Sequence, residues 1–145
     1  MKRANLTSLI PLAALLLSFS ACSSEKTPSN PSPTPDPIAP FTGVWRSTSA
    51  TGACTAMNWS VTAVTPTTAT IIYTAACAGV PVTGTANGTV TGTTMNWSAN
   101  GTAANTCAYT INGTATPATI ATDLNITYTG NVCGTPASGS DTLHR

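Results

Sequence analysis

The sequence has few charged side chains, and its long C-terminal part has almost none. Only 6% of the 145 residues are Asp, Glu, Lys or Arg, and the formal net charge is +1. Apart from cysteines and tyrosines, the ionisable side chains of residues 41–145 are Arg46, Asp123, Asp141, His144 and Arg145. Two arginines balanced by two aspartates form no basic surface for phosphate groups, so the composition argues against nucleic-acid binding.

The same scarcity leaves few side chains that could act in catalysis or bind a metal. A hydrolytic triad needs a nucleophile, a base and an orienting group, and His144, followed only by Arg145, is a poor candidate for the base. Paired-carboxylate chemistry would require Asp123 and Asp141 to face one cleft. The cysteines lack the CxxC spacing of a zinc site. We therefore expect no catalytic residue, no cofactor and no metal.

Residues 41–145 also lack the apolar spacing of an amphipathic helix. They contain all eleven glycines and are rich in threonine, which favours β structure. Alternating segments recur about every twelve residues between turn signals. They predict eight strands, at residues 42–48, 54–63, 68–76, 80–89, 93–100, 106–115, 120–129 and 138–145. We expect an all-β domain over residues 41–145, an eight-stranded up-and-down antiparallel barrel, with a small β-sandwich as the alternative.

The N-terminus has the three parts of a secretory signal peptide. Residues 1–21 begin with Met1-Lys2-Arg3, continue through an apolar stretch over residues 9–19, and end in small side chains. The apolar stretch, expected to form the signal helix, is too short for a permanent membrane span. The sequence therefore predicts export.

The end of this segment, Phe19-Ser20-Ala21-Cys22, resembles the lipobox of bacterial lipoproteins. The resemblance implies cleavage before Cys22, a diacylglycerol on its thiol, and often acylation of the new amino terminus. Two or three acyl chains make membrane anchoring stable. With Ser23 next to Cys22, the resemblance implies sorting to the outer membrane of a Gram-negative envelope, facing the periplasm or the cell surface.

Residues 22–40 connect this lipidation site to the barrel. Six prolines fall within residues 23–40, with almost no apolar side chains. Such a segment is expected to be a disordered, extended linker that reaches about 50 Å at roughly 3.1 Å per residue.

Four cysteines remain in the exported domain, where disulfides persist. If the second and third predicted strands turn about Pro66, Cys54 lies opposite Cys77, Trp59 opposite Ile72, and Val61 opposite Thr70. This register predicts a Cys54–Cys77 bridge. A similar argument about the turn near residue 117 pairs Cys107 with Cys133.

Large side chains recur on the inward positions. The tetrapeptide MNWS occurs twice, and strand alternation places Met57 with Trp59, and Met95 with Trp97, on one face. Together with Trp45, these side chains either fill the barrel interior or line a ligand pocket, because an eight-stranded barrel holds side chains or one small ligand.

The two ends of the domain resemble the calycin group, the lipocalin-like and avidin-like barrels. The resemblance rests on Gly43-Val44-Trp45 in the first strand and Arg145 in the last. It implies that Trp45 packs at the closed end and that the Arg145 guanidinium lies across its ring as a structural latch. The expected function is a monomeric envelope lipoprotein whose barrel binds a small apolar ligand. The alternative is a structural or interaction lipoprotein that contacts envelope components and has no pocket.

The predicted anchor can be tested directly. Mass spectrometry of the mature N-terminus should find acyl chains on Cys22, and the Cys22→Ala variant should lose membrane attachment, since no other thiol follows the small residues. An unmodified mature chain beginning at Ser23 or later would contradict the prediction.

Overall fold

A computed structural model describes residues 34–145. The predicted signal peptide, Cys22 and the first part of the linker lie outside the described residues. No helix within residues 34–145 has the length and apolar character needed to cross a membrane.

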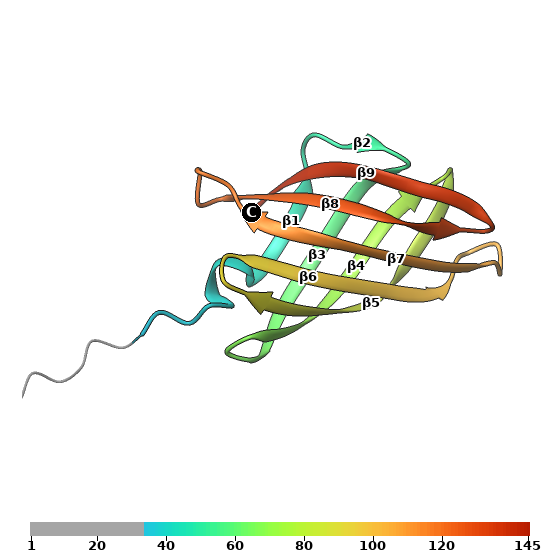
Figure 1. The fold of residues 1–145 in the computed structure, drawn as a ribbon. Coiled ribbons are helices and arrows are strands. Elements are labelled where there is room, and N and C mark those ends of the chain that lie inside the picture. Colours follow the sequence, from blue (N-terminus) through green and yellow to red (C-terminus); the bar gives the residue numbers. More distant parts are fainter. Residues whose placement is uncertain (1–33) are drawn as a thin grey trace, which may run out of the picture. The chain divides into compact units, whose positions relative to one another are not determined.

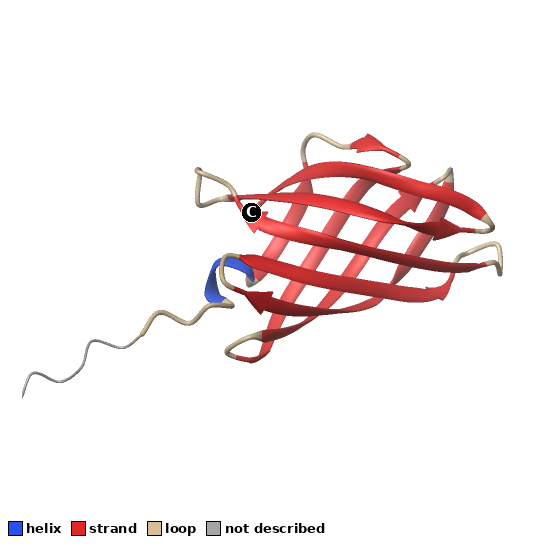
Figure 2. Cartoon of the chain, in the orientation of Figure 1, coloured by secondary structure: helices blue, strands red, loops and turns tan. Residues whose placement is uncertain are grey.

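The described residues form a closed antiparallel barrel of eight strands with one additional short strand (Figure 1; Figure 2 shows how little of it is helical). A 3-10 helix, η1 (Ala39–Phe41), precedes the strands, which are β1 (Gly43–Ser47), β2 (Thr51–Gly52), β3 (Cys54–Thr65), β4 (Thr68–Cys77), β5 (Val80–Thr91), β6 (Thr94–Thr102), β7 (Ala108–Pro117), β8 (Asp123–Val132) and β9 (Thr135–His144). Pairing of Arg46 with His144 and of Ser47 with Leu143 joins β1 to β9. The sheet therefore closes on itself, which confirms the predicted barrel and excludes the sandwich.

The eight predicted strands are present with bounds that differ by up to three residues, and three differences affect the architecture. β2 was not predicted; it pairs with β9 after the chain leaves β1. β9 begins at Thr135 instead of residue 138, because Cys133 and Gly134 form a tight turn with positive φ angles. The barrel domain also begins before residue 41, since Ile38 is 1% exposed and its amide donates to the Pro66 carbonyl, 3.1 Å away.

The predicted register between β3 and β4 is correct only at its start. Cys54 lies opposite Cys77 as expected, but Trp59 pairs with Tyr73 and Val61 with Ile71. A bulge near Ala56, whose φ is 52°, adds one residue to β3 and shifts the pairs from Asn58 to Ala63 by one; a second irregularity after Ala63 shifts the Thr65–Thr68 pair by one more. The bulge lets Cys54 and Met57, three residues apart, both face the interior.

The two faces of the barrel wall differ sharply in chemistry. Inward positions carry apolar side chains, whereas outward positions form cross-strand rows of hydroxyl and amide side chains. One such row, from β4 to β9, is Thr70, Asn87, Ser98, Asn112, Thr129 and Ser138. Strand alternation of this kind places the core inside the barrel.

Inside the barrel, large side chains lie against glycines of neighbouring strands. The Trp97 ring covers Gly113, the Tyr109 hydroxyl lies against Gly84 and Gly101, the Tyr128 ring covers Gly139, and Met95 covers Gly88. Each glycine leaves the space that a β-carbon would fill. The few large rings of this Thr- and Ala-rich chain can therefore pack along the wall.

The ends of the barrel are closed differently. At the helix end, on the left in Figure 1, η1 lies with the β3–β4 and β5–β6 turns. At the opposite end, called the disulfide end below, Cys54 bonds to Cys77 and Cys107 to Cys133. Both cysteine pairs are the ones predicted from the sequence. Each bridge is expected to stabilise the fold by roughly 2–4 kcal/mol.

Because rings pack directly on the glycines, we expect a glycine-to-alanine substitution at such a contact to destabilise the fold strongly. In Gly139→Ala the added β-carbon would collide with the Thr51 carbonyl oxygen and the Tyr128 hydroxyl. We expect a loss of about 2–4 kcal/mol in the free energy of unfolding, measured by urea denaturation. Ser138→Ala, on the exposed face of the same strand, is the matched control and should change it by less than about 0.5 kcal/mol. Equal effects of the two substitutions would contradict the packing argument.

Candidate functional site

The candidate site is a small apolar cavity inside the barrel. Its volume is about 20 Å³, and the lining comes from β3 to β7: Met57, Trp59, Tyr73, Ala75, Cys77, Val82, Trp97, Ala99 and Ile111. A space of this size holds roughly one water molecule. The interior is therefore nearly filled, and a larger guest requires side chains to move.

The two indoles of the repeated MNWS sequence meet at this cavity. The Trp59 and Trp97 rings lie edge to face, with 5.1 Å between their centroids. Met57 lines the cavity beside them and is 3% exposed. Thioether side chains repack readily, so Met57 is the lining residue best suited to make room. The Trp97 Nε1 atom is buried without a hydrogen-bond partner.

Tyr73 and Tyr109 extend into the interior, and their hydroxyls meet next to Gly84. The Tyr73 hydroxyl donates to the Tyr109 hydroxyl, which donates in turn to the Thr83 carbonyl at 3.1 Å. Burial, followed by this contact with Tyr109, raises the pKa of Tyr73 far above its usual value. The phenol therefore stays neutral, and it presents its ring to the cavity.

Trp45 is the cross-strand partner of Trp59 but does not line the cavity; its indole packs toward the helix end and is 0% exposed. Its Nε1 donates to the Phe41 carbonyl at 2.8 Å. The Arg145 guanidinium lies 4.7 Å from the Trp45 ring centroid and donates to the carbonyls of Ala121 (2.7 Å) and Thr42 (3.3 Å). These contacts join the last strand to η1, β1 and the β7–β8 loop, as expected of the latch.

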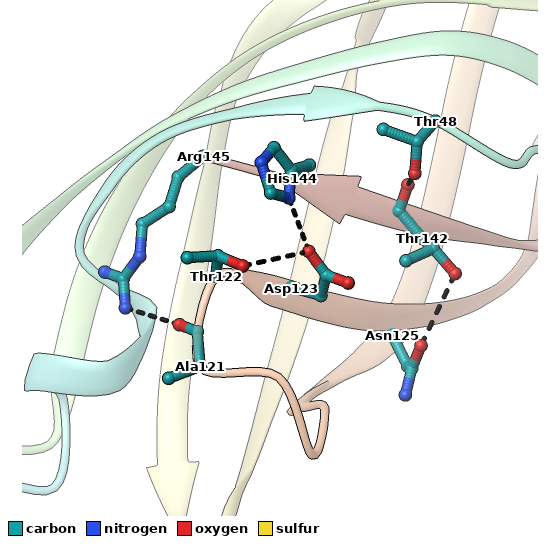
Figure 3. A network of polar contacts seen from close by, with 8 residues as sticks. All are labelled: Thr48, Ala121, Thr122, Asp123, Asn125, Thr142, His144 and Arg145. Atoms are coloured by element: carbon teal, nitrogen blue, oxygen red, sulfur yellow. Dashed lines mark hydrogen bonds and ion pairs between the residues drawn. The ribbon is translucent and has the colours of Figure 1, made fainter.

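A polar network surrounds this contact on the outside of the barrel (Figure 3). His144 Nδ1 lies 2.6 Å from Asp123 Oδ1, and the Thr122 hydroxyl donates to the same oxygen at 3.4 Å. Asp141 belongs to the opposite face of the wall and is 3% exposed. Asp123 and Asp141 therefore do not share a cleft. Residues 34–145 contain no group of three His, Cys, Asp or Glu side chains placed to hold a metal.

Asp141 is the single buried charged residue among those described. Neither carboxylate oxygen has a hydrogen-bond partner. Burial raises the pKa of Asp141, and the nearby Ser47 hydroxyl and the Ser49 and Thr142 amides oppose that rise. The carboxyl faces the interior beside Ser47 and Ser49, where the chain passes from β1 to β2.

Sequence reasoning found part of the cavity lining. The structure brings Met57, Trp59 and Trp97 together, but places Met95 over Gly88 and Trp45 at the helix end. Tyr73 was missed because the bulge at Ala56 displaced the expected register; the alternation of Ile71, Tyr73 and Ala75 was the available signal.

These features define a class: a small, closed, antiparallel β-barrel with an apolar and nearly filled interior. No protein-family model matches the chain, and no curated protein does. The similar solved structures include the following two. "Structure of EF1p2_mFAP2b bound to DFHBI" has a TM-score of 0.58 and 16% identity, covering 76% of this chain and 97% of that one. "Structure of a redesigned beta barrel, mFAP1, bound to DFHBI" has a TM-score of 0.57 and 20% identity, covering 77% and 100%. At these identities the likeness establishes the barrel fold.

The buried carboxyl predicts a pH-dependent stability. Because the pKa of Asp141 is raised in the folded state, the folded protein binds this proton more tightly than the unfolded chain, and stability falls as pH rises from about 4 through the raised pKa. Asp141→Asn should therefore be more stable than the wild type at pH 8, by on the order of 1 kcal/mol. The advantage should shrink toward pH 4. Urea denaturation across this range checks it, and an advantage that is independent of pH would contradict it.

Proposed function

We propose that this protein is a lipid-anchored lipoprotein of a bacterial envelope, sorted to the outer membrane as Ser23 implies, whose barrel binds a small apolar molecule. The anchor is Cys22, and the linker holds the barrel away from the membrane surface. The binding site is the cavity at Trp59 and Trp97. No catalytic step is assigned to it.

The observation that carries the proposal is the composition of the cavity. Every residue of its lining is apolar or aromatic, and its tyrosine hydroxyl is already paired. Small-molecule sites are mostly apolar and lie inside barrels or at their ends. The guest must be small, because the unoccupied volume is about 20 Å³ and further space has to come from Met57 and Trp97.

The similar barrels support the same use of the fold. Both are structures of proteins bound to DFHBI, and one of them is a redesigned beta barrel. DFHBI is therefore a reasonable member of a test panel for this protein, although a molecule of that size needs the interior to open.

A second candidate function has its own supporting observation. The outer wall presents hydroxyl and amide side chains, and an open groove of about 350 Å³ lies over Asn112, Thr114, Thr127 and Thr129. Such a face suits a neutral hydrogen-bonding envelope component. A protein acting through it needs no interior pocket.

A panel of benzene, indole and DFHBI separates the two functions. We expect benzene to raise the melting temperature of the wild type, and Met57→Ala to bind all three about tenfold or more tightly, because truncation of Met57 enlarges the cavity. Met95→Ala is the matched control, since Met95 is equally buried but does not line the cavity. Melting curves and tryptophan fluorescence report binding. If no compound binds the wild type or Met57→Ala, the outer-face function is favoured instead.

A further inference from the structure

The β6–β7 loop, residues 103–107, lies at the rim of the disulfide end. Ala103 is 5% exposed, and the Ala104 amide donates to the Pro81 carbonyl at 3.1 Å. Pro81 directly precedes Val82, which lines the cavity. The loop is therefore fastened to β5 next to the candidate site.

The other side of the loop is fastened by a covalent bond. Cys107 ends the loop and is bridged to Cys133, in the tight turn between β8 and β9. The Asn105 amide nitrogen lies 3.5 Å from the Cys133 sulfur. The loop is thus fastened along the rim to the strand on each side of its own hairpin, β5 beside β6 and β8 beside β7.

The two bridges differ in their access to solvent. Cys54 and Cys77 are 0% and 1% exposed and belong to the core, whereas Cys107 and Cys133 are only partly buried. Thiol–disulfide exchange requires a thiolate to reach one of the sulfurs. A soluble reductant therefore reaches Cys107–Cys133 first.

Backbone geometry around the accessible bridge is strained. Thr106 has a φ of 69° and Cys133 a φ of 57°. The left-handed region is unfavourable for residues with a β-carbon, most of all for a β-branched one. Such conformations persist where surrounding constraints hold them. Cys133 is held by the tight turn with Gly134, whereas Thr106 is held by hydrogen bonds within its loop and by its position next to the bridged Cys107.

We propose that Cys107–Cys133 is a redox-controlled clasp that fastens the β6–β7 loop against β5, beside the cavity. A dithiol reductant supplies two electrons. Its thiolate attacks one sulfur of the bridge, forms a mixed disulfide and displaces the other sulfur as a thiolate. Its second thiol then resolves the mixed disulfide, which leaves Cys107 and Cys133 reduced and the reductant oxidised. Thr106 can then relax, and the loop leaves Pro81. As a means of controlling ligand entry, the clasp rests on the proposed function.

The chemical part of the test is stepwise reduction of the oxidised mature protein with dithiothreitol, followed by alkylation and mass spectrometry. Cys107 and Cys133 should be alkylated at concentrations that leave Cys54 and Cys77 bridged. Simultaneous reduction of both bridges, or earlier reduction of Cys54–Cys77, overturns the proposal.

The structural part is hydrogen exchange at the Ala104 amide, whose acceptor is Pro81. Selective reduction should speed this exchange at least about tenfold, because the loop opens locally. The Val90 amide, bonded to the Thr67 carbonyl near the helix end, is the internal control and should not change. Unchanged exchange at Ala104 after selective reduction overturns the proposal.

A variant and a ligand complete the design. Cys107→Ser combined with Cys133→Ser should reproduce the fast exchange without reductant, and the reduced wild type keeps the test valid if this variant does not fold. Benzene exchange, followed by the Met57 methyl signal in NMR, should also become faster after reduction. If the Ala104 exchange rises but benzene does not bind in either state, the clasp is supported and the proposed binding function fails.

Discussion

The packing of large rings against glycines is the interaction on which this barrel depends. Eight strands enclose a space that only just holds side chains, and the chain supplies few large ones. Trp97 lies flat because Gly113 has no β-carbon, and Tyr128 because Gly139 has none. Tyr128 then reaches past β9, where its hydroxyl accepts a hydrogen bond from the Cys54 amide at 2.7 Å. Rings and glycines together fill the interior, join distant strands and leave only a small space beside Trp97.

The two ends of the barrel are stabilised by different chemistry. At the helix end, Trp45, Phe41 and Arg145 combine apolar burial with carbonyl hydrogen bonds and a cation–π contact. At the disulfide end, covalent bridges take the place of a packed plug. Cys77 belongs to one of these bridges and also lines the cavity.

Much of the architecture could be predicted because it follows from local patterns. Thr-rich alternation and regular glycines specified the strands, and the turn at Pro66 specified the Cys54–Cys77 pair. The bulge at Ala56 could not be predicted, since an alanine with positive φ leaves no signature in the sequence. Because of that single inserted residue, the predicted register did not place Tyr73 opposite Trp59, and Tyr73 was left out of the expected site. The burial of Asp141 was equally hidden, because a carboxylate at an inward position contradicts the pattern used to find the core. The size of the cavity depends on rotamers of Met57 and Trp97, which no periodicity encodes.

The placement of charge along the barrel determines the electrostatic field that an approaching molecule meets at each end. Within residues 34–145 the exposed ionisable groups, Asp36, Arg46, Asp123, His144 and Arg145, all lie toward the helix end. A ten-residue strand such as β8 extends tens of ångströms at about 3.3 Å per residue, well beyond a Debye length of roughly 8 Å at physiological ionic strength. Among the described residues, the disulfide end therefore carries no exposed ionisable side chain. Molecules reach it without steering by long-range fields, and shape and hydrogen bonding at contact decide which of them remain.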